Sequence, residues 1–121
     1  MNYKFDNERP IYIQLVELIR IEIISGKLSP GERIPSVREL SLQLRVNPNT
    51  LQKALQELEN VGLIYTERTN GKFVTEDKKL IEKIKKELAQ IKVNKYLTDM
   101  QNIGVNKEDA VKYLEELGGD K

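Results

Sequence analysis

Residues 36–62 read SVRELSLQLRVNPNTLQKALQELENVG and contain two helix start signals close together. Ser36-Val37-Arg38-Glu39 is a capping box, in which the serine oxygen accepts from the third helical amide and the glutamate reaches back. The helix that follows should end near Arg45. Asn47 and Pro48 then supply an N-cap and a proline at the first helical position. Two helices with so short a turn between them predict a helix-turn-helix.

The second of these helices has two unlike faces. It is expected to run from Pro48 to about Val61 and to end at Gly62. Its inward face carries Leu51, Leu55 and Leu58. On the helical wheel the opposite face is polar and lacks acids, because it carries Asn49, Gln52, Lys53 and Gln56.

A further helix is expected before this pair. It begins at Pro10 and stops at Ser25-Gly26, and its apolar stripe consists of Tyr12, Leu15, Val16, Ile19 and Ile23. The Pro-Gly signal in residues 28–32 predicts a turn. Arg33-Ile34-Pro35 predicts a short extended piece, since a residue before proline avoids the helical region.

Two β-prone runs follow the helix pair, over residues 63–67 and 72–75. They are joined through Arg68-Thr69-Asn70-Gly71, and Asn-Gly between β-prone runs is a strong hairpin signal. Helix, helix-turn-helix and hairpin in this order predict a mainly α, α+β winged helix-turn-helix domain over residues 1–76.

Residues 77–121 predict a C-terminal tail of two helices that serves dimerisation. Its first helix is long, Ile103–Asn106 breaks it, and a short last helix ends at Gly118-Gly119. The long helix carries an apolar stripe of Ile81, Ile84, Leu88 and Ile91. One helix cannot bury this stripe alone, so we expect an isologous contact between two tails. The alternative is a tail that folds back onto its own domain. The predicted seam comprises Leu80, Ile81, Ile84, Leu88, Ile91, Leu97, Met100, Val111 and Leu114.

Composition excludes several classes of function. The chain has neither cysteine nor histidine, so disulfides, thiolate nucleophiles, imidazole bases and most zinc sites are excluded, and no metal or cofactor is expected. Carboxylate pairs such as Glu57 with Glu59, or Glu115 with Glu116, diverge on a helix and do not predict an enzyme. No apolar run reaches the roughly 20 residues that span a bilayer, and the N-terminus lacks a secretion signal. We therefore expect a cytoplasmic protein without a membrane partner.

The charges are distributed unevenly, although the formal net charge is only +1. Between residues 33 and 53 four basic residues accompany the single acid Glu39, and Arg68 and Lys72 lie at the hairpin. These stretches predict a locally positive side that suits double-stranded DNA. The alternative is a winged helix that binds proteins, which would show an apolar patch on the helix of residues 48–61.

Three segments carry a specific resemblance: LSPGERIPSVREL (28–40), VNPNTL (46–51) and LENVGLI (58–64). They resemble the GntR family of bacterial regulators over roughly Pro10 to Thr75. The PSVREL and VNPNT segments, with so short a tail, resemble its smallest branch, the YtrA type. The resemblance implies a homodimeric transcriptional regulator, a repressor on a palindromic operator, of a kind that often controls transporter operons. Whether an effector exists is left open, because about forty-five tail residues hardly enclose a ligand cavity.

The resemblance also implies residue roles. The arginine at Arg38 contacts DNA, residues 47–50 face the operator, and residues 70–72 enter the minor groove. Pro48 and Gln52 stand where better-known members carry arginines, so base preference cannot be transferred. By chemistry, Asn49 and Gln52 are candidates for base reading, and Ser36 and Thr50 for phosphate contacts. The full predicted set is Arg33, Ser36, Arg38, Asn47, Pro48, Asn49, Thr50, Gln52, Lys53, Arg68, Thr69, Asn70, Gly71 and Lys72.

Overall fold

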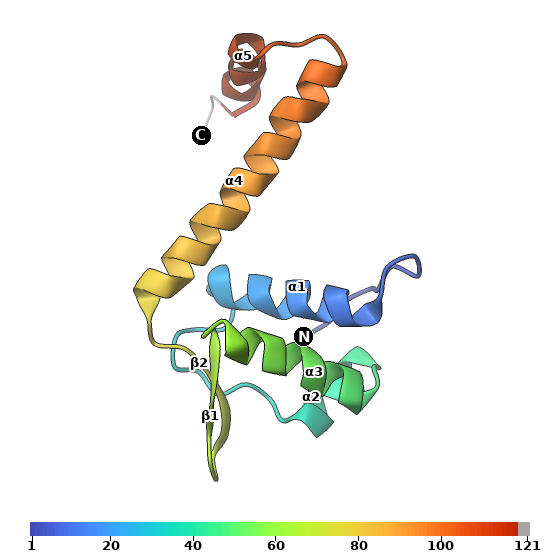
Figure 1. Cartoon of the computed structure of the whole chain (residues 1–121), viewed down its shortest axis with the longest axis vertical. Helices are drawn as coiled ribbons and strands as arrows, with labels where there is room; N and C mark the ends of the chain where they lie inside the picture. The colour runs from blue at the N-terminus through green and yellow to red at the C-terminus, as the bar shows by residue number, and fades with distance from the viewer. Residues whose placement is uncertain (119–121) are drawn as a thin grey trace. The chain divides into compact units, whose positions relative to one another are not determined.

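The computed structural model describes residues 1–118 and is shown in Figure 1. Its elements, in chain order, are α1 (Ile11–Ile24), α2 (Val37–Leu44), α3 (Pro48–Asn60), β1 (Ile64–Glu67), β2 (Gly71–Val74), α4 (Lys78–Asn102) and α5 (Lys107–Gly118). The mainly α winged helix-turn-helix is therefore confirmed. The predicted helix end at Gly119 lies outside the described residues.

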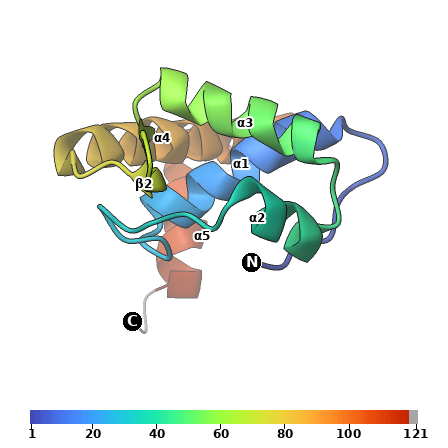
Figure 2. The ribbon, with the colours of Figure 1, turned by 90° about the horizontal axis from the view of Figure 1, so that it is seen from below.

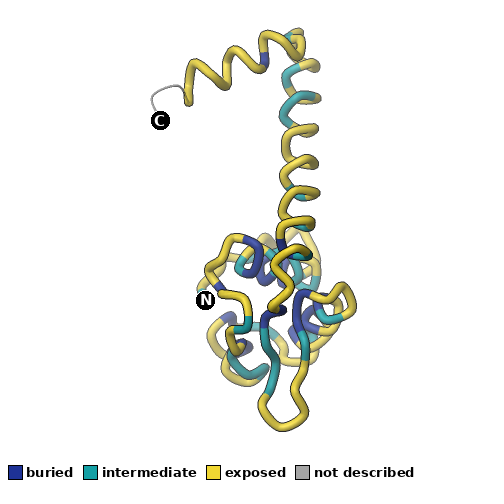
Figure 3. Tube along the Cα trace, turned by 90° about the vertical axis from the view of Figure 1, so that its left-hand side faces the viewer, coloured by how far each residue is buried: buried dark blue, intermediate teal, exposed yellow. Residues whose placement is uncertain are grey.

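The chain divides into two compact units, which we call the head (Met1–Ile84) and the tail unit (Lys85–Lys121). This division falls inside α4, whereas the sequence predicted a boundary between residues 76 and 77. The first turns of α4 thus belong to the head. Figure 3 shows that the buried residues gather mainly in the head.

The core of the head forms where α1 packs against α3, with α2 and β1 also against α3 (Figures 1 and 2). The predicted leucines of α3 are all buried. Full burial of one such side chain contributes about 1.5–3 kcal/mol relative to exposure. The fully buried large side chains are Leu15, Ile19, Ile23, Ile34, Leu40, Leu51, Leu55, Leu58, Leu63, Ile64, Gln14 and Val74.

Helix α1 differs from its prediction in two details. Pro10 is the N-cap, so the helix begins at Ile11, one residue later than predicted. Tyr12 and Val16 are only half-buried, and Leu18 is buried in their place. The contact with α3 is thus rotated about the helix axis relative to the predicted stripe.

The fully buried Gln14 of α1 was not predicted. Its Nε2 donates to the carbonyls of Asp6 (2.7 Å) and Arg9 (2.8 Å), and its Oε1 accepts from the amide of Asp6 (2.8 Å). A buried amide costs little when its donors and acceptors are paired. This side chain therefore ties the N-terminal segment to α1.

The helix-turn-helix has both predicted caps. Ser36 Oγ accepts from the Glu39 amide (3.1 Å), and Glu39 Oε1 accepts from the Ser36 amide (3.3 Å). Helix α2 ends at Arg45, whose φ of 57° is left-handed. Asn47 Oδ1 then accepts from the Asn49 amide (2.7 Å) and starts α3.

The capping box should make the stability of the head depend on pH. The hydrogen bond from the Ser36 amide, helped by the Ser36 hydroxyl, lowers the pKa of Glu39. A lowered pKa in the folded state gives stability that is present above the unfolded pKa and is lost as pH falls through the folded pKa. Glu39→Ala should therefore lower the free energy of unfolding at neutral pH, and the deficit should shrink in acid. Urea unfolding of both proteins over an acid pH series measures this, and a deficit that stays constant into acid contradicts it.

The hairpin pairs Ile64 with Val74 and Glu67 with Gly71. Its loop is Arg68–Asn70, and Gly71 opens β2 with a φ of 99°, which suits glycine. The predicted extended piece lies alongside, because the Ile34 amide donates to the carbonyl of Lys72 (2.8 Å). This bond joins the segment before α2 to the hairpin of β1 and β2, which we call the wing.

In the tail unit, α4 and α5 are joined by a turn in which Gly104 has a φ of 87°. The Tyr96 hydroxyl donates to the carbonyl of Ala110 (2.7 Å), and Ala110 is buried. Large apolar side chains of this unit remain exposed, namely Ile91, Val93, Ile103, Val111, Tyr113, Leu114 and Leu117.

Candidate nucleic-acid interface

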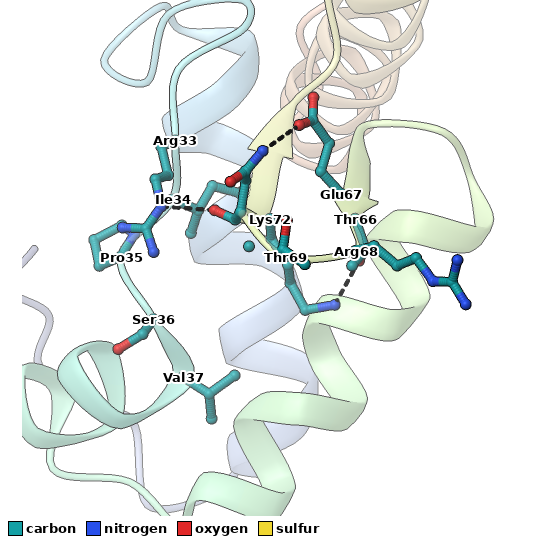
Figure 4. Close-up of a pocket in the computed structure, with 12 residues that line it drawn as sticks. Arg33, Ile34, Pro35, Ser36, Val37, Thr66, Glu67, Arg68, Thr69 and Lys72 are labelled. Carbon is teal, nitrogen blue, oxygen red and sulfur yellow. Dashed lines mark hydrogen bonds between the residues drawn. The ribbon is translucent and has the colours of Figure 1, made fainter.

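A groove of about 350 Å³ lies between the start of α2 and the hairpin (Figure 4). Residues 33–37 form one wall, and residues 66–72 form the other. Two stretches that are distant in sequence are thus brought together. The predicted DNA contacts that line this groove are Arg33, Ser36, Arg68, Thr69, Asn70, Gly71 and Lys72.

The start of α3 presents the other predicted contacts to solvent. Asn49, Gln52 and Lys53 are exposed, and Thr50 is half-buried. The oxygen of Asn47 is occupied by the cap, so this side chain fixes the helix start. Pro48 is exposed at the first helical position.

Two arginines of this region are available to an external anion. Arg38 on α2 and Arg68 in the hairpin loop are both exposed. Within residues 1–118 neither guanidinium has an ion-pair partner. Figure 4 shows the Arg68 side chain pointing away from Arg33 and Ser36. An unpaired guanidinium is the group that binds phosphate or guanine most readily.

Lys53 has an intramolecular contact. Its ammonium lies 5.8 Å from the centroid of the Tyr12 ring, and the Tyr12 hydroxyl donates to Glu57. That hydrogen bond, together with desolvation, raises the pKa of Tyr12. This cation–π contact restrains the side chain of Lys53, which is exposed on the polar face of α3.

Arg33 and Lys72 are both bound by the protein itself. Arg33 Nε donates to the carbonyl of Asn70 (2.9 Å). Lys72 Nζ donates to Thr66 Oγ1 (2.9 Å) and lies 3.4 Å from Glu59 Oε2. Both residues were predicted as DNA contacts, and that prediction stands beside the partners that the protein itself supplies to them.

The contacts of Lys72 with Glu59 and Thr66 were not predicted from the sequence. The pairing of Thr66 with Lys72 follows from the hairpin register and could have been found from it. Glu59 carries no such local signal, because its contact depends on how the hairpin packs on α3.

The residues predicted for the dimer seam differ in their exposure within the single chain. Ile81 is 8% exposed within the single chain, so it belongs to the core of the head. Leu80 packs on the turn after α3, since a Cβ at Gly62 would lie 3.1 Å from its Cδ2. Ile81 is therefore covered within its own chain, whereas the half-buried Leu80 remains a prediction for the seam. Ile84, Leu88, Leu97 and Met100 are half-buried, and Ile91, Val111 and Leu114 are exposed.

Residues 1–118 contain no group of three or more acidic side chains that could hold a metal ion. None of the helices in this range is long and apolar enough to cross a bilayer.

Comparison with known proteins gives consistent results. The family model for bacterial regulatory proteins of the gntR family matches residues 11–74. The HTH-type transcriptional repressor YtrA of Bacillus subtilis is 35% identical over 92% of this chain and 86% of its own length.

Two solved structures extend the comparison. A GntR family transcriptional regulator from Listeria monocytogenes matches with a TM-score of 0.87 and 40% identity, over 93% of this chain and 98% of that one. The DNA-binding domain of AraR in complex with operator ORX1 matches with a TM-score of 0.56 and 33% identity. It covers 62% of this chain and 95% of that chain.

Proposed function

The chain belongs to the GntR family of bacterial regulatory proteins, which are transcriptional regulators and not enzymes, and from this premise we propose that it represses transcription as a homodimer on a palindromic operator. The observation that carries the proposal is the exposed polar start of α3 beside two unpaired arginines and a wing groove. The DNA-binding domain of AraR, which is 33% identical in sequence, was solved in complex with its operator and supports binding of DNA by this fold.

We assign sequence reading to the start of α3. In a helix-turn-helix the second helix enters the major groove with its N-terminal residues at the base edges. Asn49 and Gln52 are exposed there, and their amides can pair bidentately with adenine. Lys53, Thr50 and Ser36 are assigned to backbone phosphates, which position the protein without reading sequence.

The hairpin is assigned to the adjacent minor groove. Its loop residues Arg68, Thr69 and Asn70 are exposed. A narrow minor groove attracts a guanidinium because its negative potential is enhanced. Arg68, which has no ion-pair partner in the described chain, is the residue we expect to enter it.

The tail unit is assigned to dimerisation. In the single chain, seven large apolar side chains of this unit are each more than 40% exposed to solvent. An isologous contact between two tail units would cover both sets at once. Two heads joined in this way could occupy half-sites one helical turn apart.

The repressor role rests on relatives. YtrA of Bacillus subtilis carries the name of a transcriptional repressor, and the match covers most of both chains. We propose that this protein also represses transcription, that it acts in the cytoplasm, and that its target is a transporter operon. The proposal requires no metal, cofactor or effector.

The proposal is tested by selecting duplexes from a random-sequence library with the purified protein. We expect a palindrome whose half-sites are about 10–10.5 bp apart, centre to centre. No enriched sequence contradicts specific binding, and occupancy of one half-site by a monomer contradicts the dimer.

Two variants should then behave differently on the selected duplex. Arg38→Ala should weaken binding to all sequences and reduce the salt dependence, because it removes a charged contact. Asn49→Ala should relax preference at one position of each half-site, by about 1–3 kcal/mol. Arg9→Ala is the matched control, since Arg9 pairs with Glu17 at the start of the head. Equal binding by wild type and Arg38→Ala would overturn that assignment.

A further inference from the structure

Three side chains from three elements form a closed cluster beneath the wing. Lys72 of β2 donates to Thr66 Oγ1 of β1 at 2.9 Å and lies 3.4 Å from Glu59 Oε2 of α3. The Thr66 hydroxyl donates in turn to Glu59 Oε1 at 2.5 Å. Each member therefore contacts both of the others. Figure 4 shows the hydrogen bond between Lys72 and Thr66 on the hairpin wall of the groove.

The cluster lies where the orientation of the wing is determined. Glu59 is in the last turn of α3, and only residues 61–63 separate that helix from β1. Thr66 and Lys72 are directly paired across the hairpin, so their side chains share one face. A bond from this face to Glu59 restrains rotation of the hairpin about the short connection.

Partial burial makes the loss of one partner of this ion pair more costly than in an ordinary surface pair. The side chains of Lys72 and Glu59 are 17% and 22% exposed. By contrast, the pair of Lys95 with Asp99 in the tail unit is largely exposed. Exposed pairs contribute little, whereas removing one partner of a shielded pair leaves a charge without compensation.

We propose that Glu59, Thr66 and Lys72 are positioning residues that hold the wing at a fixed angle to the reading helix. Lys72 acts through Glu59 and makes no DNA contact of its own. The inference rests on the proposed DNA-binding function. Because α3 and the wing read one half-site together, a change in their angle lowers affinity for the operator and leaves non-specific binding unchanged.

Glu59→Gln separates this role from a phosphate contact by the sign of its effect. If Lys72 bound phosphate, Glu59 would compete with DNA, and its removal would tighten binding and steepen the salt dependence. If the cluster positions the wing, the same change weakens operator binding. Lys72→Met adds a second criterion, since a lost phosphate contact lowers the slope of log K against log salt by about 0.9 per lysine. Loss of positioning leaves that slope unchanged.

The DNA probes are the duplex that the wild-type protein selects from a random-sequence library and a scrambled duplex of equal composition. We expect the ratio of the two affinities to fall about tenfold in Glu59→Gln and in Lys72→Met, comparable to one mismatched base pair. The double variant should lose no more than either single variant, because the residues act as one unit. Lys72→Arg, which keeps the charge pair, should restore most of the ratio. Lys27→Met, which breaks the pair of Lys27 with Glu22, is the control.

A readout without DNA makes the outcomes distinguishable. In the free protein, amides of β1 and β2 should exchange with solvent faster in both single variants and at the wild-type rate in the Lys27 control. A wild-type protein that selects no sequence contradicts the DNA-binding proposal, while hydrogen exchange still decides the cluster. Tighter operator binding by Glu59→Gln, or unchanged hairpin exchange in both variants, overturns the positioning role.

Discussion

Leu114→Asp should give a monomer that binds the selected operator about 10²- to 10⁴-fold more weakly than wild type, the range by which linking two binding modules raises affinity. Leu114 is 51% exposed in the single chain, so a carboxylate there stays hydrated in the monomer. In an isologous contact each subunit contributes one such carboxylate, and burying both without a partner costs desolvation free energy. The head should remain folded, because its core lies within Met1–Ile84.

Sedimentation and operator titration at one salt concentration measure the two effects. Lys112→Asp is the matched control, since it places the same carboxylate on the polar side of α5. It should remain dimeric and bind normally. A Leu114→Asp protein that is still dimeric would show that α5 takes no part in the contact between subunits.

Leu55→Ala should lower the free energy of unfolding by about 2–5 kcal/mol, the cost of a cavity in a packed core. Leu55 is 0% exposed on α3, the helix against which α1, α2 and β1 all pack. For a domain of this size that is a large share of a total stability of about 5–15 kcal/mol.

Urea unfolding followed by circular dichroism measures this loss. Leu42→Ala on α2 makes the same chemical change at a side chain that is 72% exposed, and it should change stability by less than about 0.5 kcal/mol. Equal losses in the two variants would mean that the assigned core is misplaced.

The features that sequence predicted well are those determined by neighbours in the chain. The caps at Ser36 and Asn47 close rings within three residues, so residue type and spacing suffice. The leucine face of α3 follows from helical periodicity, and the hairpin follows from Asn70-Gly71.

The features that sequence did not predict depend on packing between elements. The burial of Gln14 requires two carbonyls from the preceding segment, and Ile81 finds its cover only once the head has formed. The ion pair of Lys72 with Glu59 could not be predicted, because periodicity does not show which side chain of another element lies beside the hairpin. Charge in the sequence indicated a positive side of the head, and tertiary contacts show which of its cations have partners within the protein.

The apolar side chains that a single tail unit leaves in water, such as Ile91 and Leu117, also bear on how a gene circuit would respond. In the proposed dimer the active species forms by mass action from two chains. At low copy number its amount varies with the square of the subunit concentration, so halving synthesis leaves about a quarter of the dimer. A modest change in expression or dilution by cell growth would then release a promoter sharply. The threshold is set by the affinity between subunits and needs no signalling molecule.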